Sequence, residues 1–319
     1  MSKYSEPPLD FTRLSTIPLA ERGGKVRIEH MAAPHRAGAS LREWLDRLPR
    51  LLAADSLRAV VAAMAEARRR KRAILWGLGG HVVKCGLAPV LVDLMDRGFV
   101  TGIAMNGATS IHDFEIALAG ATSEDVEAVL PDGRFGSAEE TGRLMNEAIR
   151  RAGDADCGMG EALGAALDSL APAEFAPCSL LLQAWRRSIP VTVHAAIGTD
   201  TPHTHPAASG AAIGEATHRD FRLFCSLVRG LHDGGVYLNV GSAVVLPEVF
   251  LKAVSAVRNL QYPLADFVTA NFDFLDHYRP RMNVVQRPHA RCGGAGYSIT
   301  GHHEILVPLL AALLVEADA

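Results

Sequence analysis

The chain has 319 residues, 49% of them hydrophobic, which is enough to bury a sizeable core in one large domain or two small ones. Charged residues make up 21% and the net charge is −3, so the chain has no general attraction to nucleic acid or to acidic membrane surfaces. The first residues lack the plan of a signal peptide, and no apolar run approaches the about 20 residues of a membrane span. Five single cysteines favour reduced thiols. We therefore expect a soluble, cytoplasmic protein.

Residues 1–40 are predicted to form an irregular arm, because prolines and glycines interrupt them throughout. Such an arm would lie on the body of the protein or on a neighbouring subunit. From Ser40 onward, leucines recur at helical spacing. Ser56 is predicted to cap a second helix, which ends in the basic run 68–72. Residues 41–319 are predicted to form a single α/β domain.

Strands and helices alternate in the rest of the chain. A short apolar run at 73–76 stops at a glycine-rich turn, an amphipathic segment follows to Arg97, and a second apolar run covers 100–105. Strands are then expected at 189–194, 235–240 and 266–270, and helices at 137–170, 178–187, 217–231, 247–260 and 304–316. This alternation predicts a doubly wound, mostly parallel, Rossmann-like sheet with helices on both faces.

The carboxyl ends of the predicted strands are polar and rich in glycine. Ligands of doubly wound sheets bind at such ends. The turn with Gly79 and Gly80 could present helix amides to a phosphate, or it could simply be a tight strand-to-helix turn. Asn106 and Gly107 follow the second strand, and Gly241 and Ser242 follow a later one. These segments are candidates for a nucleotide-cofactor cleft.

Histidines and acids gather in the same loops. Asp200, His203 and His205 could bind a divalent metal such as zinc or iron, although single loop histidines are usually exposed or bonded to backbone. Asp113, Asp273 and Asp276 could bind a cation or tune a histidine, or they could cap turns. The sequence leaves these alternatives open.

Taken in order, these loops resemble deoxyhypusine synthase over roughly residues 70–315. That family has an NAD-binding α/β fold, forms tetramers and transfers the aminobutyl group of spermidine to a protein lysine. The resemblance matches Gly79, Gly80 and His81 to the turn that cradles NAD, Asp113 to a retained acid, and Gly301–His303 to the final NAD-contacting turn. It also implies that Asp273 and Asp276 are retained acids.

The catalytic positions of that family differ in this chain. The resemblance aligns the family's catalytic histidine with Glu248 and its catalytic lysine with His289. After Lys84 the only lysine is Lys252, in an apolar helix, and a histidine cannot form the imine that the family's reaction requires. The paired glutamates that would hold a polyamine are also missing. Deoxyhypusine synthesis itself is therefore not expected.

We accordingly expect an NAD-type cleft used for a lysine-independent reaction, an oxidation or a group transfer, on a small polar or amine-bearing substrate. His289 or His302 would act as general base, with His303 near the cofactor. The alternatives are a metal-dependent enzyme using the histidine- and aspartate-rich loops, and a non-catalytic member of the fold. A homo-oligomer, dimer or tetramer, is expected from the resemblance; no nucleic acid or membrane partner is expected.

Overall fold

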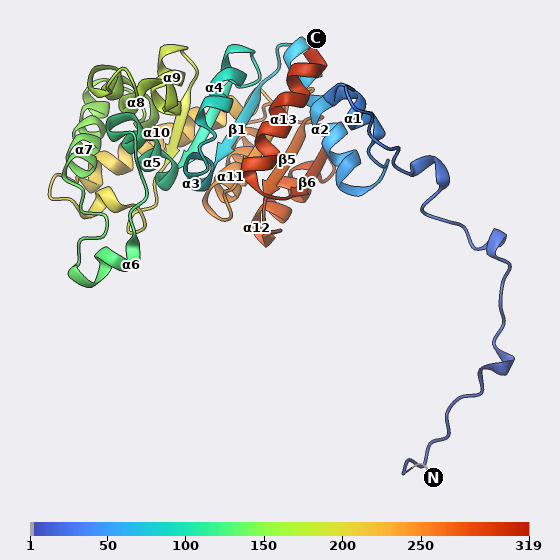
Figure 1. Ribbon diagram of the computed structural model, residues 1–319. Coiled ribbons are helices and arrows are strands. Elements are labelled where there is room, and N and C mark those ends of the chain that lie inside the picture. The colour runs from blue at the N-terminus through green and yellow to red at the C-terminus, as the bar shows by residue number, and fades with distance from the viewer. Residues whose placement is uncertain (1–2, 319) are drawn as a thin grey trace.

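The central element is a parallel sheet, as predicted. In the computed structural model, which describes residues 3–318, six strands lie in the order β3-β2-β1-β4-β5-β6. All five neighbouring pairs are parallel. The strands are β1 (Ile74–Leu78), β2 (Gly102–Asn106), β3 (Val191–His194), β4 (Val236–Val240), β5 (Val268–Asp273) and β6 (Ala295–Thr300). Helices cover both faces, so the fold is a doubly wound, Rossmann-like α/β fold (Figure 1).

The helices alternate with these strands. They are α1 (Leu41–Arg47), α2 (Leu52–Arg69), α3 (Gly80–Lys84), α4 (Ala88–Asp96), α5 (Gly107–Ala119), α6 (Val126–Val129), α7 (Glu139–Asp154), α8 (Met159–Leu170), α9 (Leu180–Arg186), α10 (Gly210–Arg229), α11 (Val245–Asn259), α12 (Tyr278–Pro280) and α13 (His303–Asp318). Helices α5 to α9 all lie between β2 and β3, and α7 and α8 pack against α10. This helical insertion extends the molecule beyond β3 (Figure 1).

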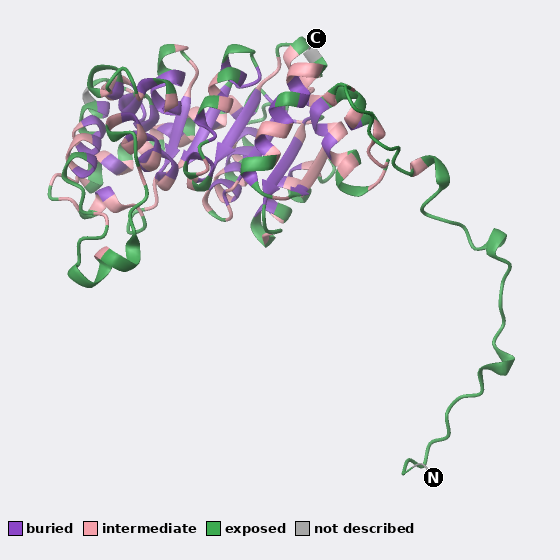
Figure 2. Ribbon diagram, in the orientation of Figure 1, coloured by how far each residue is buried: buried purple, intermediate pink, exposed green. Residues whose placement is uncertain are grey.

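Two apolar cores flank the sheet because its buried side chains alternate between the faces. Ile74, Trp76 and Leu78 of β1 belong to the core shared with α2, α4 and α13. Leu75 belongs to the second core, which α10 and α11 close. The central strands are accordingly buried along their whole length (Figure 2). The rigid sheet fixes where the polar loops at its carboxyl edge lie.

Three predicted boundaries are wrong. Residues 295–300 form edge strand β6, which was missed because its small, half-buried residues make no apolar run. Ser56 does not cap a helix: it lies inside α2, and its hydroxyl donates to the Leu52 carbonyl at 3.2 Å. The helix expected to start at 217 begins earlier, at Gly210, whereas the helices expected over 137–170 are present as α7 and α8, with Asp156 between them at φ 55°.

The segment before α1 is an extended arm. Residues 3–40 contain three short 3-10 turns, and nearly all residues of this segment are exposed. Figure 1 shows this segment leaving the body beside α1 and running far from it. Within residues 3–318, no helix has the combination of length and apolarity that crossing a membrane requires.

Candidate functional site

The strand order reverses direction between β1 and β4. The chain runs outward from β1 through β2 to β3 and then returns to β4 on the other side of β1. In doubly wound sheets, ligands bind at the carboxyl ends of the strands at such a reversal. Here those ends meet at two glycines: a Cβ on Gly79 would lie 2.0 Å from the carbonyl oxygen of Gly241. Only glycine permits this contact, so the backbones of the two strand ends touch each other directly.

The predicted glycine turns are brought together at this reversal. Gly80 begins α3, where a Cβ would lie 3.2 Å from both Ala108 Cβ and His112 Cδ2. Gly241 has φ 69°, a left-handed conformation that glycine adopts without strain. The Ser242 hydroxyl accepts a hydrogen bond from the Leu246 amide at 3.2 Å, so it supports the start of α11.

Two histidines and a phenylalanine form a cluster over the same edge. The His81 ring lies 5.4 Å from that of His303 and 5.6 Å from that of Phe274. His303 is completely buried, whereas His81 is exposed. The Nε2 of His303 lies 3.2 Å from the Phe272 carbonyl oxygen, to which it can only donate. Its Nδ1 is then an unprotonated acceptor, and this atom has no hydrogen-bond partner among the described residues.

The surroundings of His303 favour its neutral form. Burial lowers the pKa of His303, and the Phe272 carbonyl and the Asp273 carboxylate oppose this effect. Asp273 Oδ1 lies 4.0 Å from His303 Nε2 and accepts the Phe274 amide at 2.8 Å. The histidine is therefore held in one orientation with a free lone pair at its second nitrogen.

The other predicted catalytic residues lie in different places. His302 is exposed beside His303, with Nδ1 3.8 Å from Glu304 Oε1. Asp276 accepts from Arg281 Nη1 at 3.1 Å. Glu248, in the first turn of α11, pairs with Lys252, and this contact lowers its pKa.

His289 lies at the opposite edge of the sheet. Its Nε2 is 2.8 Å from Thr269 Oγ1, near the start of β5, and its ring packs 5.0 Å from that of Phe267. A Cβ on Gly294, just before β6, would lie 3.1 Å from His289 Nδ1. The structure therefore does not bring His289 together with His302 and His303, because an amino end of a parallel strand is one strand length from the carboxyl edge.

The start of α5 is closed by the protein's own side chains. Asn106 caps this helix by accepting the Thr109 amide at 2.9 Å. A Cβ on Gly107 would lie 2.0 Å from a carboxylate oxygen of Asp200, so that carboxylate covers the helix start. Asp113 points away, into the interior, where it accepts from Ser179 Oγ at 2.7 Å and from the Leu180 amide at 2.6 Å. Its carboxylate thus caps α9.

The predicted metal ligands Asp200, His203 and His205 are not gathered around one point. Asp200 Oδ2 lies 4.0 Å from His203 Nε2. His205 turns to α7 instead, with Nε2 3.1 Å from Glu139 Oε2. Among residues 3–318, the three-residue group with metal-ligand spacing is His81, Cys85 and Glu304. Cys85 and Glu304 were not among the predicted ligands, although His81 and Cys85 have the i, i+4 spacing that puts both on one side of a helical turn.

A polar cavity opens at the carboxyl edge between α3 and α5. Its volume is about 210 Å³, and its lining includes Lys84, His112, Glu115 and Asp200. His112 Nδ1 lies 2.7 Å from Thr122 Oγ1, whose hydroxyl also donates to Glu115. Burial lowers the pKa of His112, with Glu115 opposing. Lys84 and Glu115 were not predicted as site residues, because neither belongs to a strand-end turn.

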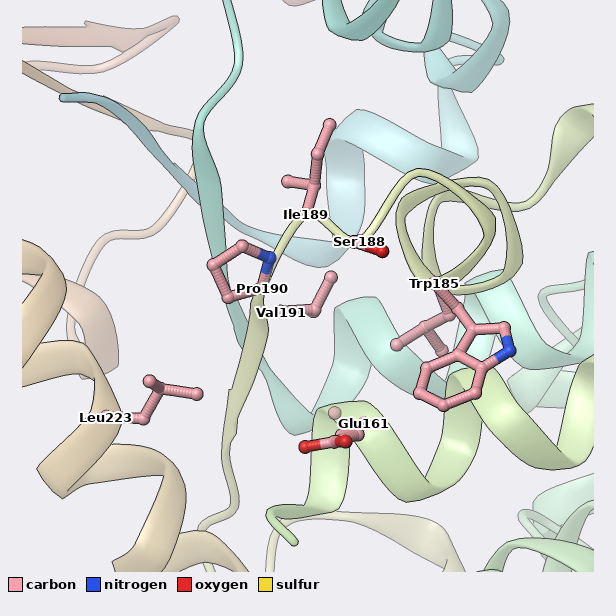
Figure 3. Close-up of a pocket in the computed structure, with 9 residues that line it drawn as sticks. Glu161, Trp185, Ser188, Ile189, Pro190, Val191 and Leu223 are labelled. Carbon is pink, nitrogen blue, oxygen red and sulfur yellow. The ribbon is translucent and has the colours of Figure 1, made fainter. Parts of the chain in front are cut away.

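A larger cavity lies elsewhere. It has a volume of about 430 Å³ and opens beside the amino end of the edge strand β3. Figure 3 shows Trp185, Ile189 and Leu223 around it, with Glu161 as its acidic group. Because it is at the opposite end of β3 from the strand-end loops, it is separate from the candidate site.

Neither a family model nor a curated protein sequence matches the chain. Solved structures do share its fold. Unliganded AgrE superposes with a TM-score of 0.54 at 16% identity, covering 85% of this chain and 34% of AgrE. The ternary complex of AgrE with ornithine and NAD+ gives 0.52 at 15% identity, with the same coverage. This chain therefore spans about a third of the length of AgrE.

A third match is a provisionally assigned deoxyhypusine synthase from Entamoeba histolytica. It has a TM-score of 0.50 at 12% identity and covers 86% of this chain and 93% of the other. The chain has the Rossmann-like α/β architecture of these proteins. At such identities the likeness shows the fold alone, so the predicted relation to deoxyhypusine synthase is confirmed only at the level of architecture.

Proposed function

We propose that the carboxyl edge of the sheet binds an NAD-type dinucleotide. The reversal of strand order at Gly79 and Gly241 carries this proposal, because doubly wound folds bind nucleotides at such a reversal and no Cβ projects from the two strand ends there. The unpartnered Nδ1 of buried His303 at the same edge is an acceptor that a bound ligand can satisfy. The shared fold with AgrE, which has been crystallised with NAD+, supports the proposal.

The nucleotide would extend from the reversal toward the cavity beside α5. Lys84 offers that cavity a cation for phosphate, and Glu115 offers a carboxylate for hydroxyl groups. Gly79, Gly80, His81, Gly241 and Ser242 border the other end. Asn106 and Asp113 contribute by holding α5 and α9 in place, as their hydrogen bonds indicate.

The reaction we propose is hydride transfer from a small polar or amine-bearing substrate. NAD supplies a hydride acceptor when bound. In that reaction the nicotinamide would accept a hydride from a substrate carbon, and the neighbouring nitrogen or oxygen would lose a proton. We assign that proton to exposed His302 rather than to His289, because His289 lies at the opposite edge. Asp273 holds His303 beside the reacting atoms. No lysine is needed for these steps.

Titration with NAD+ and NADH tests the cofactor assignment. Val244 is 49% exposed in the loop after β4, so Val244→Trp should fill the cleft and weaken NADH binding at least about tenfold. Leu260→Trp is the matched control: Leu260 is 65% exposed at the far end of α11, and this variant should bind as the wild type does. Absence of NADH fluorescence change at millimolar concentration, or equal binding by both variants, would remove the proposal.

We also propose that the protein works as a homo-oligomer, and that the arm of residues 3–40 packs on another copy. Its large apolar side chains support this, since they are strongly exposed: Leu9, Phe11, Leu14, Ile17, Leu19, Val26, Ile28 and Met31. Surfaces of this kind are typical of protein interfaces.

A further inference from the structure

His81, Cys85 and Glu304 converge from two segments far apart in the sequence. His81 lies in α3, and Cys85 ends that helix one turn later, where its amide donates to the His81 carbonyl at 2.9 Å. Glu304 lies in the first turn of α13. Because α13 packs in the same layer as α4, the two segments are fixed by the apolar core rather than by the three polar groups themselves.

We propose that these three side chains form a zinc site. Their nearest ligand atoms all lie within 4.8 Å of one another, and Cys85 Sγ is 3.7 Å from Glu304 Oε2. Tetrahedral zinc with a Zn–S bond of about 2.3 Å and a Zn–O bond of about 2.0 Å separates sulfur from oxygen by about 3.5 Å. The observed spacing therefore already matches the edge of such a tetrahedron.

The donor set selects the metal. A thiolate with an imidazole and one carboxylate suits zinc, whereas magnesium and calcium prefer oxygen ligands. The charge of a bound zinc ion would offset those of a thiolate and a carboxylate together.

Three protein ligands leave one position open. His81 and Glu304 are exposed and Cys85 is half-buried, so the fourth position is accessible from solvent. Sites of this composition hold a water molecule or a substrate atom there. Completely buried His303 packs beside the site, its ring 5.4 Å from that of His81. His81 also borders the proposed nucleotide cleft, whereas Cys85 and Glu304 belong to the zinc site alone, so Cys85→Ser and Glu304→Gln separate the two proposals.

Cobalt substitution of the full-length protein, purified without a polyhistidine tag, tests the site. Co²⁺ bound to a thiolate gives an intense charge-transfer band in the near ultraviolet, and we expect one equivalent to produce it. Zinc should displace the cobalt. Cys85→Ser should abolish the band, and Glu304→Gln and His81→Gln should each weaken Co²⁺ and Zn²⁺ binding at least about 100-fold. Thermal unfolding of each variant in the absence of metal checks that it is folded.

Two controls separate this site from the other polar groups. Cys292→Ser changes another half-buried thiol, and His203→Gln changes the histidine beside Asp200. Both variants should keep the wild-type band and affinity. Lack of a thiolate band in the wild type, a band that survives Cys85→Ser, or equal loss in His203→Gln would overturn the zinc site. NADH binding is measured on the same samples, so failure of either proposal is seen independently of the other.

Discussion

Two buried carboxylates hold the helical insertion together and join it to the sheet. Asp113 of α5 accepts the first amides of α9. Asp220 of α10 accepts the Gly160 amide of α8 at 2.9 Å and the Val193 amide of β3 at 2.7 Å. Burial raises the pKa of Asp113 to about 6 and that of Asp220 to about 7, although these amides oppose the shift. The Asp220 side chain thus joins three elements. Burying its charge lowers the free energy of unfolding.

The pH dependence of stability should reveal this cost at Asp220. The folded pKa is about 7 and the ordinary value is 3.8, so the unfolded state loses the proton first and the wild type loses stability as pH rises between those values. Asp220→Asn keeps an acceptor and removes the charge. The free energy of unfolding of the wild type relative to Asp220→Asn should fall by about 1 kcal/mol per pH unit from pH 5 to 7.

Urea unfolding at several pH values measures this difference. Asp220→Ala is the contrasting variant, because it leaves the Gly160 and Val193 amides without their acceptor; it should be about 2–4 kcal/mol less stable than Asp220→Asn at every pH. A pH-independent difference between the wild type and Asp220→Asn would contradict the raised pKa.

Among the elements, the contact between the ends of β1 and β4 determines the shape of the candidate site. An added Cβ at Gly79 meets backbone, which cannot move aside as a flexible side chain can. Gly79→Ala should therefore lower the free energy of unfolding by about 2–3 kcal/mol and weaken NADH binding.

The matched control is Gly214→Ala in α10. A Cβ at Gly214 has open space around it, so this variant should gain about 0.5–1 kcal/mol from helix propensity alone. Chemical denaturation measures both variants. Equal stability of the two would show that the strand ends can separate at little cost.

Most helices and strands could be predicted from the sequence, but the positions of the site side chains could be predicted less well. Five strands were found from apolar runs, because central parallel strands are buried on both faces. The edge strand β6 lacks such a run. Side-chain direction was harder to predict: Asp113 and His289 both follow polar turns, yet one caps α9 and the other lies at the opposite edge. The Cys85–Glu304 contact depends on packing between distant segments, which spacing alone does not encode.

On the scale of the whole molecule, the arm and the body differ in how they bury apolar surface. The body encloses most of its large apolar side chains in two cores, whereas the large apolar side chains of the arm are exposed. A second copy of the chain would supply the missing surface. We expect Phe11→Ser, Leu14→Ser and Ile17→Ser, combined in the full chain, to convert an oligomer to a monomer without lowering the melting temperature of the body.

Light scattering coupled to size exclusion measures the mass. Leu52→Ser is the control, since Leu52 is 88% exposed at the start of α2 and belongs to the body; it should leave the oligomer intact. A wild-type protein that elutes as a monomer at micromolar concentration would refute the role of the arm.

The strand order also has a consequence for biosynthesis. β1 pairs with β2 on one side and with β4 on the other. The ribosome synthesises β4 only after β2, the helical insertion and β3. Until Val236–Val240 emerges, the nascent chain carries β1 with one side unpaired, and closing that contact requires a long loop, which slows folding. Truncations that end before β4 should therefore aggregate. In the whole chain, β1 and β4 should pair at a late stage of folding.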